Sequence, residues 1–344
     1  MELLLPVTVV GAVGLFFGVG LAIASKMLHV FVDPKISRIL EALPGVNCGA
    51  CGYPGCSAFA KAVAVGKAAA AGCTPGGEKT VANIADIMGI SVSANEPMVA
   101  VIHCQGGKAE AKERAIYDGI TDCHAAKLIG NGPKICPDGC LGRGSCAKAC
   151  LFGAIKINEN EIAVIDNEKC CGCGKCVPVC PRNIISLIPQ VHKVYLACAN
   201  RDKGAGVKKY CSVGCTACTL CVKATPSGAI TMADNLPVLD YTKDEIFIVA
   251  HAKCPPKCFI DLAKMRPKAN IDTKCTGCGE CAKACPMKNV ITGEPNERHV
   301  IDKGKCIGCG NCLNVCAVKA IVLWGGLGYD SVEKQKRQRH GATG

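Results

Sequence analysis

Cysteine spacing constrains this chain more than any other feature. Thirty of its 344 residues are cysteine, and most stand in dense runs with two-residue gaps, followed by a further cysteine. A short secreted chain this rich in cysteine suggests a disulfide scaffold, and two separated pairs suggest a zinc site. This chain is too long for a small disulfide scaffold, and its cysteine runs are too dense for zinc sites. The run C-x2-C-x2-C-x3-C is the bacterial iron–sulfur signature, in which the fourth cysteine ligates the other cluster of a two-cluster unit.

Composition agrees with small modules built around metal centres. Only 4% of the residues are aromatic, so hydrophobic cores must be small, and clusters would supply the cross-links that small modules need. The formal net charge is +12 with thiols counted as neutral. A [4Fe–4S]²⁺ cluster with four thiolates carries about −2, so six clusters would bring the loaded protein near neutrality. The basic balance therefore does not indicate nucleic-acid binding.

The N-terminal segment reads as a membrane anchor. Residues 3–25 carry no charged side chain and are numerous enough to span a bilayer. A cleaved signal peptide is the alternative, but Glu2 precedes the apolar run and the run is long for such a peptide. Lys26, Lys35 and Arg38 follow. We therefore expect a single-pass anchor at 1–27 in the cytoplasmic (inner) membrane, with the bulk of the chain in the cytoplasm.

A separate four-cysteine domain is expected at 33–90. It contains "LPGVNCGACGYPGC", and its four candidate ligands are Cys48, Cys51, Cys56 and Cys73. The alanine-rich run 58–71 predicts a helix between the third and fourth ligands. Residues 91–133, which include two isolated cysteines, are expected to link this domain to the remainder.

The remainder predicts an α+β array of ferredoxin-like modules at 134–192, 193–265 and 266–325, followed by a basic tail at 326–344. "GAIKI", "GAITM" and "KAIVL" follow the cysteine runs and predict short strands. The last module is the most regular. Its crossover pairing predicts two ligand sets: Cys275, Cys278 and Cys281 with Cys316, and Cys306, Cys309 and Cys312 with Cys285.

The first module departs from this pattern. Arg143 stands where the middle cysteine of its first run belongs, and Cys136 precedes Cys140 by four residues. We therefore expect Cys136 to replace the missing ligand. The two predicted sets are Cys136, Cys140, Cys146 and Cys180, and Cys150, Cys170, Cys173 and Cys176.

The second module is a degenerate copy of the first, because residues 101–188 and 195–260 repeat one another. "KICPDGCLGRGSCAKACLFGAI" matches "KYCSVGCTACTLCVKATPSGAI". In this alignment the ligands of one cluster correspond to Thr225, Asp244, Phe247 and Ala250. The other set is complete: Cys215, Cys218, Cys221 and Cys254. One cluster has thus been lost and its sister kept. Cys211 aligns with Cys136, so it could also replace Cys215 or Cys218.

The assignment gives six sets of four cysteines for about six [4Fe–4S] clusters. Six cysteines remain outside these sets and are expected to act as small buried apolar residues: Cys104, Cys123, Cys171, Cys198, Cys211 and Cys258. Cys104 and Cys198 occupy matching positions of the repeat, which favours a shared packing role.

An apolar N-terminal helix, then "CGACGYPGC", then ferredoxin modules resembles the B subunit of the Rnf complex, in a long polyferredoxin-type version. Corrinoid iron–sulfur proteins share a similar small domain but neither the anchor nor the array. The resemblance implies a component of a membrane-bound ferredoxin:NAD⁺ oxidoreductase, a translocase that moves sodium ions or protons. It also implies other membrane and peripheral subunits as partners, and soluble reduced ferredoxin as the electron donor.

The chain itself is expected to carry electrons and not to hold a catalytic site. It has no G-x-G-x-x-G after a strand and no phosphate-binding loop, so flavin and NAD⁺ are expected on other subunits. An Rsx-like relay that keeps a redox regulator reduced is one alternative, and a structural iron–sulfur membrane scaffold is another. Basic residues around the last module could steer an acidic ferredoxin: Lys274, Lys283, Lys288, Arg298, Lys303 and Lys305.

Overall fold

The computed structural model describes residues 4–27, 33–93, 95–243 and 246–325. The chain divides into two compact units, Met1–Ala94 and Asn95–Gly344, and each is described by itself. The basic tail expected at 326–344 and the repeat position Asp244 lie outside the described residues.

The first unit begins with α1 (Leu4–Met27). A helix of 24 residues is about 36 Å long at about 1.5 Å per residue, which exceeds the roughly 30 Å hydrocarbon core of a bilayer. The span Thr8–Met27 has a mean hydropathy of 2.0 and is not buried against the protein. Among the described residues it is the one helix long and apolar enough to cross a membrane.

The four-cysteine part of this unit is helical. Its elements are α2 (Pro34–Ala42), α3 (Cys56–Ala64), two 3₁₀ turns (Ala70–Gly72 and Thr74–Gly76) and α4 (Gly77–Met88). Ile39, Phe59 and Ile84 form the centre of its core. The helix expected over 58–71 ends earlier, at Ala64, because Gly66 adopts a left-handed conformation with φ +73°.

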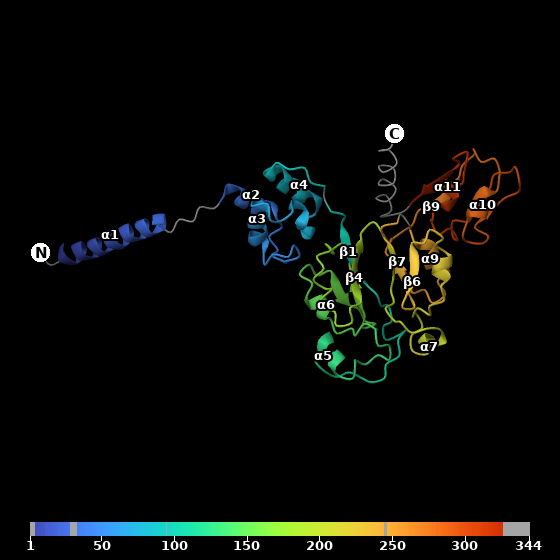
Figure 1. The fold of residues 1–344 in the computed structure, drawn as a ribbon, viewed down its shortest axis with the longest axis horizontal. Helices are drawn as coiled ribbons and strands as arrows, with labels where there is room; N and C mark the ends of the chain where they lie inside the picture. Colours follow the sequence, from blue (N-terminus) through green and yellow to red (C-terminus); the bar gives the residue numbers. More distant parts are fainter. Residues whose placement is uncertain (1–3, 28–32, 94, 244–245, 326–344) are drawn as a thin grey trace. The chain divides into compact units, whose positions relative to one another are not determined.

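The second unit repeats one strand pattern three times (Figure 1). In each copy an outer antiparallel pair encloses an inner hairpin. The outer pairs are β1 (Met98–Ile102) with β4 (Ile185–Pro189), β5 (Val194–Leu196) with β8 (Phe259–Asp261), and β9 (Lys268–Ile271) with β12 (Ile321–Trp324). The hairpins are β2 (Ile155–Ile157) with β3 (Ala163–Ile165), β6 (Ile230–Ala233) with β7 (Leu236–Leu239), and β10 (Ile291–Thr292) with β11 (Val300–Ile301).

Short helices complete the modules. They are α5 (Cys123–Leu128), α6 (Ser145–Lys148), α7 (Ala205–Lys208), α8 (Leu220–Lys223), α9 (Ile248–Lys253), α10 (Glu280–Ala284) and α11 (Asn311–Asn314). The strands expected from "GAIKI", "GAITM" and "KAIVL" are β2, β6 and β12. The α+β class expected from the sequence is therefore confirmed.

The linker expected at 91–133 is corrected by the structure. Its residues build the first module: β1 pairs with β4 along its whole length, and its inner residues are buried. A few residues later, Ala111 bridges to Cys211 and Glu113 to Lys134. The module boundaries were predicted from the positions of the cysteine runs. The strand β1 contains no cysteine, so its place in the module was not recognised.

The first two modules share a core. Val99, Ile188 and Tyr195, from β1, β4 and β5, belong to one buried cluster. His103 adds a polar tie, because its Nδ1 lies 2.6 Å from the Leu196 carbonyl oxygen and its Nε2 lies 2.7 Å from Ser186 Oγ. Burial lowers the pKa of His103, so the neutral ring that suits this buried site is favoured.

Where the repeat predicts a lost cluster, the second module holds an apolar core. Phe247 and Ala250, which stand at former ligand positions, are buried in the main cluster of this module. The Phe247 ring packs edge-on against Tyr241, with centroids 5.6 Å apart, and lies 6.1 Å from His192. Thr225, a third such position, is also buried, and its backbone N–H bonds to the Val222 carbonyl oxygen. Side-chain packing thus fills the place where the repeat would otherwise predict a cluster.

Phe247→Ala should therefore destabilise the second module by about 3–5 kcal/mol, the usual cost of emptying a large aromatic site. Phe247 is 1% exposed. Val238→Ala is the control, because Val238 on β7 is 49% exposed and should change stability by less than about 0.5 kcal/mol. Anaerobic urea unfolding measures both. Equal midpoints for the two variants would contradict the packing role of Phe247.

Candidate iron–sulfur sites

The four cysteines of the first unit come together as expected. Cys56 begins α3, and its backbone N–H donates to Asn47 Oδ1 at 2.8 Å. Burial raises the pKa of Cys73, and the neighbouring thiols of Cys56, Cys48 and Cys51 raise it further. The loop before α3 and the turn after it therefore bring four sulfur atoms to one place.

The last module shows the crossover arrangement. A hollow of about 360 Å³, partly open to solvent, is lined by one cysteine from the end of α10 and three from the run around α11. These are Cys285, Cys306, Cys309 and Cys312. In the other set, burial and then the thiols of Cys275 and Cys278 raise the pKa of Cys281. Cys316 lies in the same apolar core, and its sulfur accepts the Ala320 N–H at 3.2 Å.

The second run of the first module forms another group. Burial, followed by the thiols of Cys170, Cys173 and Cys150, raises the pKa of Cys176 to about 11. The Cys170 sulfur accepts the Ala100 N–H at 3.4 Å, and the Cys150 sulfur accepts the Ala154 N–H at 3.3 Å. Cys171, which was expected to be a small apolar residue, lies beside Cys173 and Cys170.

The first run of this module groups differently from the expected set. A hollow of about 340 Å³ is lined by Cys123, Cys140, Cys146 and Cys180. Burial and then the thiols of Cys140, Cys123 and Cys180 raise the pKa of Cys146 to about 12. Cys136, the expected fourth member, lines a different hollow with Cys104, Cys198 and Cys211. In this structure Cys123, and not Cys136, lies beside the other three expected members.

Local capping explains why Cys123 reaches this hollow. Asp122 caps α5 and accepts the hydroxyl of Ser145, Oγ to Oδ2, at 2.8 Å. Ser145 in turn accepts the Cys123 N–H at 2.8 Å. Because Ser145 immediately precedes Cys146, these bonds fix the start of α5 beside the hollow. The signal in the sequence was an aspartate at a helix N-cap followed directly by a cysteine. No cysteine spacing links this pair to the other cysteines of the hollow.

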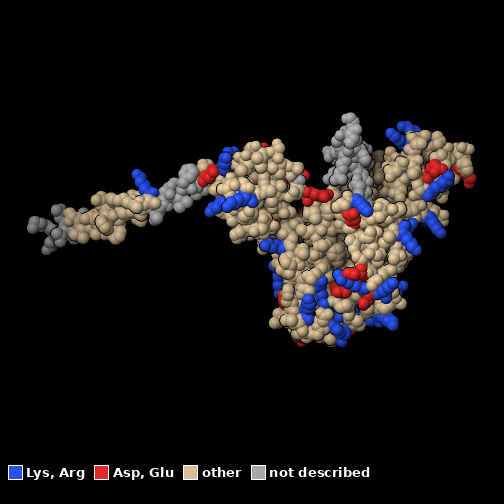
Figure 2. All heavy atoms as spheres, in the orientation of Figure 1, with Lys and Arg blue, Asp and Glu red and all other residues tan. Residues whose placement is uncertain are grey.

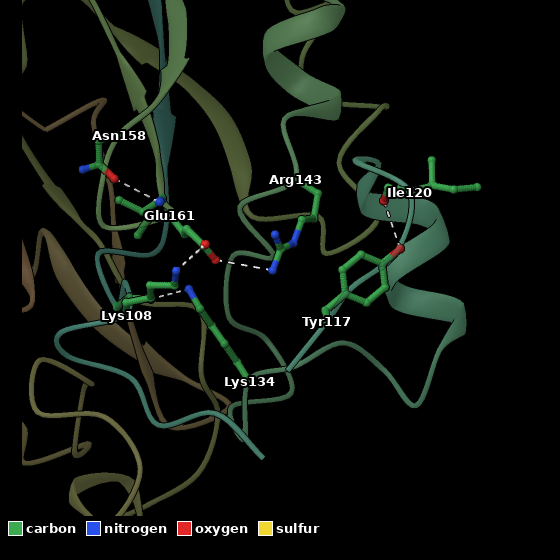
Figure 3. A network of polar contacts seen from close by, with 9 residues as sticks. Lys108, Tyr117, Ile120, Lys134, Arg143, Asn158 and Glu161 are labelled. Atoms are coloured by element: carbon green, nitrogen blue, oxygen red, sulfur yellow. Dashed lines mark hydrogen bonds and ion pairs between the residues drawn. The ribbon is translucent and has the colours of Figure 1, made fainter. Parts of the chain in front are cut away.

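Arg143, at the position of the missing cysteine, is engaged elsewhere (Figure 3). One of its nitrogens, Nη2, lies 3.4 Å from Glu161 Oε2, and its guanidinium carbon lies 5.1 Å from the centroid of the Tyr117 ring. Lys108 Nζ approaches the other Glu161 oxygen at 2.6 Å. An ion pair and a cation–π contact therefore hold this side chain, and it does not line the hollow of Cys140 and Cys146.

The second module has five thiols around its hollow of about 290 Å³. They are the four expected ligands, Cys215, Cys218, Cys221 and Cys254, together with Cys258. The Cys254 and Cys258 sulfur atoms are 3.3 Å apart. Hydrogen bonds with Cys258 lower the pKa of Cys215 and Cys254. The alternative that Cys211 joins this set does not agree with the structure, since Cys211 lines the hollow that contains Cys136.

These thiol groups fit iron–sulfur clusters better than single ions. Within the described part of the chain, no three His, Cys, Asp or Glu side chains are close enough to hold one metal ion. The sulfur atoms instead surround hollows, as a cubane with four outward-facing irons requires. Several also accept backbone N–H groups, an interaction that tunes cluster potentials. The residues present therefore fit [4Fe–4S] clusters.

Comparisons with known proteins agree with this chemistry. Family models match at residues 43–75 (putative Fe-S cluster), 163–186 (4Fe-4S binding domain) and 268–317 (4Fe-4S dicluster domain). The B subunit of the Na(+)-translocating ferredoxin:NAD(+) oxidoreductase complex of Acetobacterium woodii is 42% identical over 74% of this chain and 77% of its own length.

Two further relatives extend the match. The B subunit of the proton-translocating ferredoxin:NAD(+) oxidoreductase complex of Clostridium ljungdahlii is 38% identical over 72% of this chain and 86% of its own length. The B subunit of the ion-translocating oxidoreductase complex of Methanosarcina acetivorans is 32% identical over 83% of this chain and 96% of its own length. This chain therefore belongs to the family of B subunits of ion-translocating, Rnf-type oxidoreductase complexes, as an iron–sulfur electron-transfer component.

Proposed function

We propose that this chain accepts electrons from soluble reduced ferredoxin and passes them toward NAD-reducing, ion-translocating partner subunits. The observation that carries the proposal is the succession of thiol-lined hollows through every module of the second unit. The names of the Acetobacterium and Clostridium relatives, which are ferredoxin:NAD(+) oxidoreductase subunits, support the donor and the final acceptor.

The proposed ligand sets follow the grouping of the thiols. The first unit holds one cluster, and the last module holds the two crossover sets. The second module holds one, with Cys258 beside its four ligands. The first module holds two, with Cys123 in place of Cys136 in the set that includes Cys140, Cys146 and Cys180. Each cluster supplies one-electron chemistry; the protein supplies burial and N–H donors that set its potential.

The proposed location is the inner membrane, with the second unit on the cytoplasmic side. α1 supplies a membrane span by length and composition. Lys26 lies in the last turn of α1, and Lys35 and Arg38 follow it. All three are exposed, as expected for the cytoplasmic end of a span. No flavin or nucleotide site is proposed for this chain, and other subunits are proposed to bind those cofactors.

The last module offers a basic surface to an acidic donor. The six lysine and arginine side chains singled out in its sequence are all exposed, and Figure 2 shows basic side chains over this part of the chain. Three of them are already engaged: Lys283 with Glu280 at 2.7 Å, Lys305 with Asp302 at 3.2 Å, and Arg298 with the Ile271 carbonyl oxygen. Lys274, Lys288 and Lys303 form no ion pair with any described residue, so they are the better candidates for docking.

Charge reversal tests this surface. The triple variant Lys274→Glu, Lys288→Glu and Lys303→Glu should slow reduction by ferredoxin about tenfold or more at low salt, because electrostatic steering is lost. Added salt should shrink the difference, and a small chemical reductant should reduce both proteins equally. Stopped-flow absorbance measures the rates. The matched control is Lys61→Glu, Lys67→Glu and Lys79→Glu, exposed in the first unit. If both triple variants slow the reduction equally, ferredoxin does not dock on this surface of the last module.

Cluster counting tests the corrected ligand set. Cys123→Ala should lower the number of [4Fe–4S] clusters by one, because it removes one of four thiols from its hollow. Thr225→Ala should leave the number of clusters unchanged, because Thr225 lies in a region that is filled by packed side chains. Anaerobic native mass spectrometry, with iron and sulfide assays, gives the counts. A full count in the Cys123 variant would restore the sequence-based assignment to Cys136.

Reversible reduction tests the electron-transfer role itself. Dithionite should reduce the loaded protein, and oxidation should restore its spectrum over repeated cycles. Clusters that resist reduction altogether would instead fit a structural scaffold.

A further inference from the structure

Four cysteines that belong to none of these sets surround a hollow of their own. Cys104 and Cys136 come from the first module, and Cys198 and Cys211 come from the second. The hollow has a volume of about 370 Å³, partly open to solvent, which is similar to the hollow of the regular crossover set. Cys136, Cys198 and Cys211 are buried. The four thiols therefore converge from two modules across their shared boundary.

The duplication gives this hollow two matching halves. Cys104 aligns with Cys198 and Cys136 aligns with Cys211 in the internal repeat. The structure keeps this correspondence: the Cys104 sulfur accepts the Cys140 N–H at 3.3 Å, and the Cys198 sulfur accepts the Cys215 N–H at 3.3 Å. The two halves of the hollow are therefore built alike, each with a sulfur atom bonded to the amide of a cysteine in a neighbouring set.

The other two sulfur atoms also meet donors. Asn200 is buried, and its Nδ2 lies 3.5 Å from Cys136 Sγ. The backbone N–H of Asp138 also donates to Cys136, and the backbone N–H of Val213 donates to Cys211. Donors directed at sulfur are the surroundings in which metal-bound thiolates are found.

A buried cation adds to this environment. Lys134 is 2% exposed, and its Nζ donates to the Gly106 carbonyl oxygen at 2.7 Å. It forms no ion pair within the described ranges, and a buried ammonium is costly without nearby negative charge. The Glu161 carboxylate, whose pKa is lowered by Lys108, Arg143 and Lys134, supplies part of that charge, and Figure 3 shows Lys134 extending toward Lys108 and Glu161. A thiolate-bound cluster would add further negative charge.

Glycine allows the close approach that the hollow needs. A Cβ on Gly106 would lie 3.1 Å from Cys211 Sγ and 3.3 Å from Ala111 Cβ. A side chain there would force the Cys211 sulfur atom to shift slightly. Glycine therefore lets the backbone of the first module approach the Cys211 thiol without displacing it.

We propose that Cys104, Cys136, Cys198 and Cys211 bind a seventh [4Fe–4S] cluster at the boundary of the first two modules. The alternatives fit less well. The structure pairs no described cysteines as disulfides, and no three described His, Cys, Asp or Glu side chains are grouped so that they could hold a single metal ion. If the four cysteines acted only as small apolar residues, they would need neither the buried Lys134 ammonium nor the N–H groups that donate to their sulfur atoms.

This site lies between two of the sets already proposed. The amide that bonds to Cys104 belongs to Cys140, a member of the Cys123 set. The amide that bonds to Cys198 belongs to Cys215, a member of the second-module set. The boundary site is thus linked by a single hydrogen bond to each of two neighbouring ligand sets. One of these sets belongs to the first module and the other to the second.

Native mass spectrometry of the anaerobically reconstituted full chain, with iron, sulfide and zinc assays, tests the proposal. The wild type should carry seven clusters. The variants Cys104→Ala/Cys198→Ala and Cys136→Ala/Cys211→Ala should each carry six, with the other clusters retained. Cys171→Ala is the control, because it removes a thiol outside the proposed sets, and it should carry seven.

Six clusters in the wild type, with or without one zinc ion, would overturn the proposal, and so would seven clusters in both double variants. If the double variants misfold and lose several clusters, the number of clusters in the wild type alone tests the proposal. Counting needs no electron donor. A failed ferredoxin assay would therefore count against the proposed function and leave this inference standing.

Discussion

Sulfur atoms held around hollows by backbone amides are the arrangement on which the rest of the second unit depends. Its strands are two to five residues long and its helices four to six, and elements this short are not stable by themselves. In each module one group of cysteines lines a hollow, and cysteines share an apolar cluster with residues of the inner hairpin. In the first and last modules the same bond recurs, from Ala154 N–H to Cys150 and from Ala320 N–H to Cys316. Loading with metal and folding are therefore expected to be coupled.

The second module shows what can replace a cluster. At the lost site, Phe247 packs against Tyr241 and His192 and closes the space that four ligands would surround. The exchange preserves the outer strand pair and the inner hairpin, β5 with β8 and β6 with β7. A ferredoxin-like module thus needs its interior filled, and an aromatic core or a metal centre can fill it.

The sequence predicted those parts of the structure that depend on local spacing. In the last module the distance from Cys306 to Cys309 and Cys312 determines the turn geometry, so the crossover grouping follows from the run itself. Cys123 was missed because it reaches its hollow through a capped helix, a tertiary contact without a spacing rule. Cys258 was expected to be a small buried residue and is buried, but the spacing gave no sign that its sulfur atom would lie beside that of Cys254. The strand β1 was missed because no cysteine marks it.

The apolar cluster of Val99, Ile188 and Tyr195 has a consequence for how the chain can be divided. It belongs to both of the first two modules, so neither can be excised without exposing the face of the other. A break in the chain between residues 190 and 193 would therefore separate two halves of one folding unit, and each half would present an apolar patch to water.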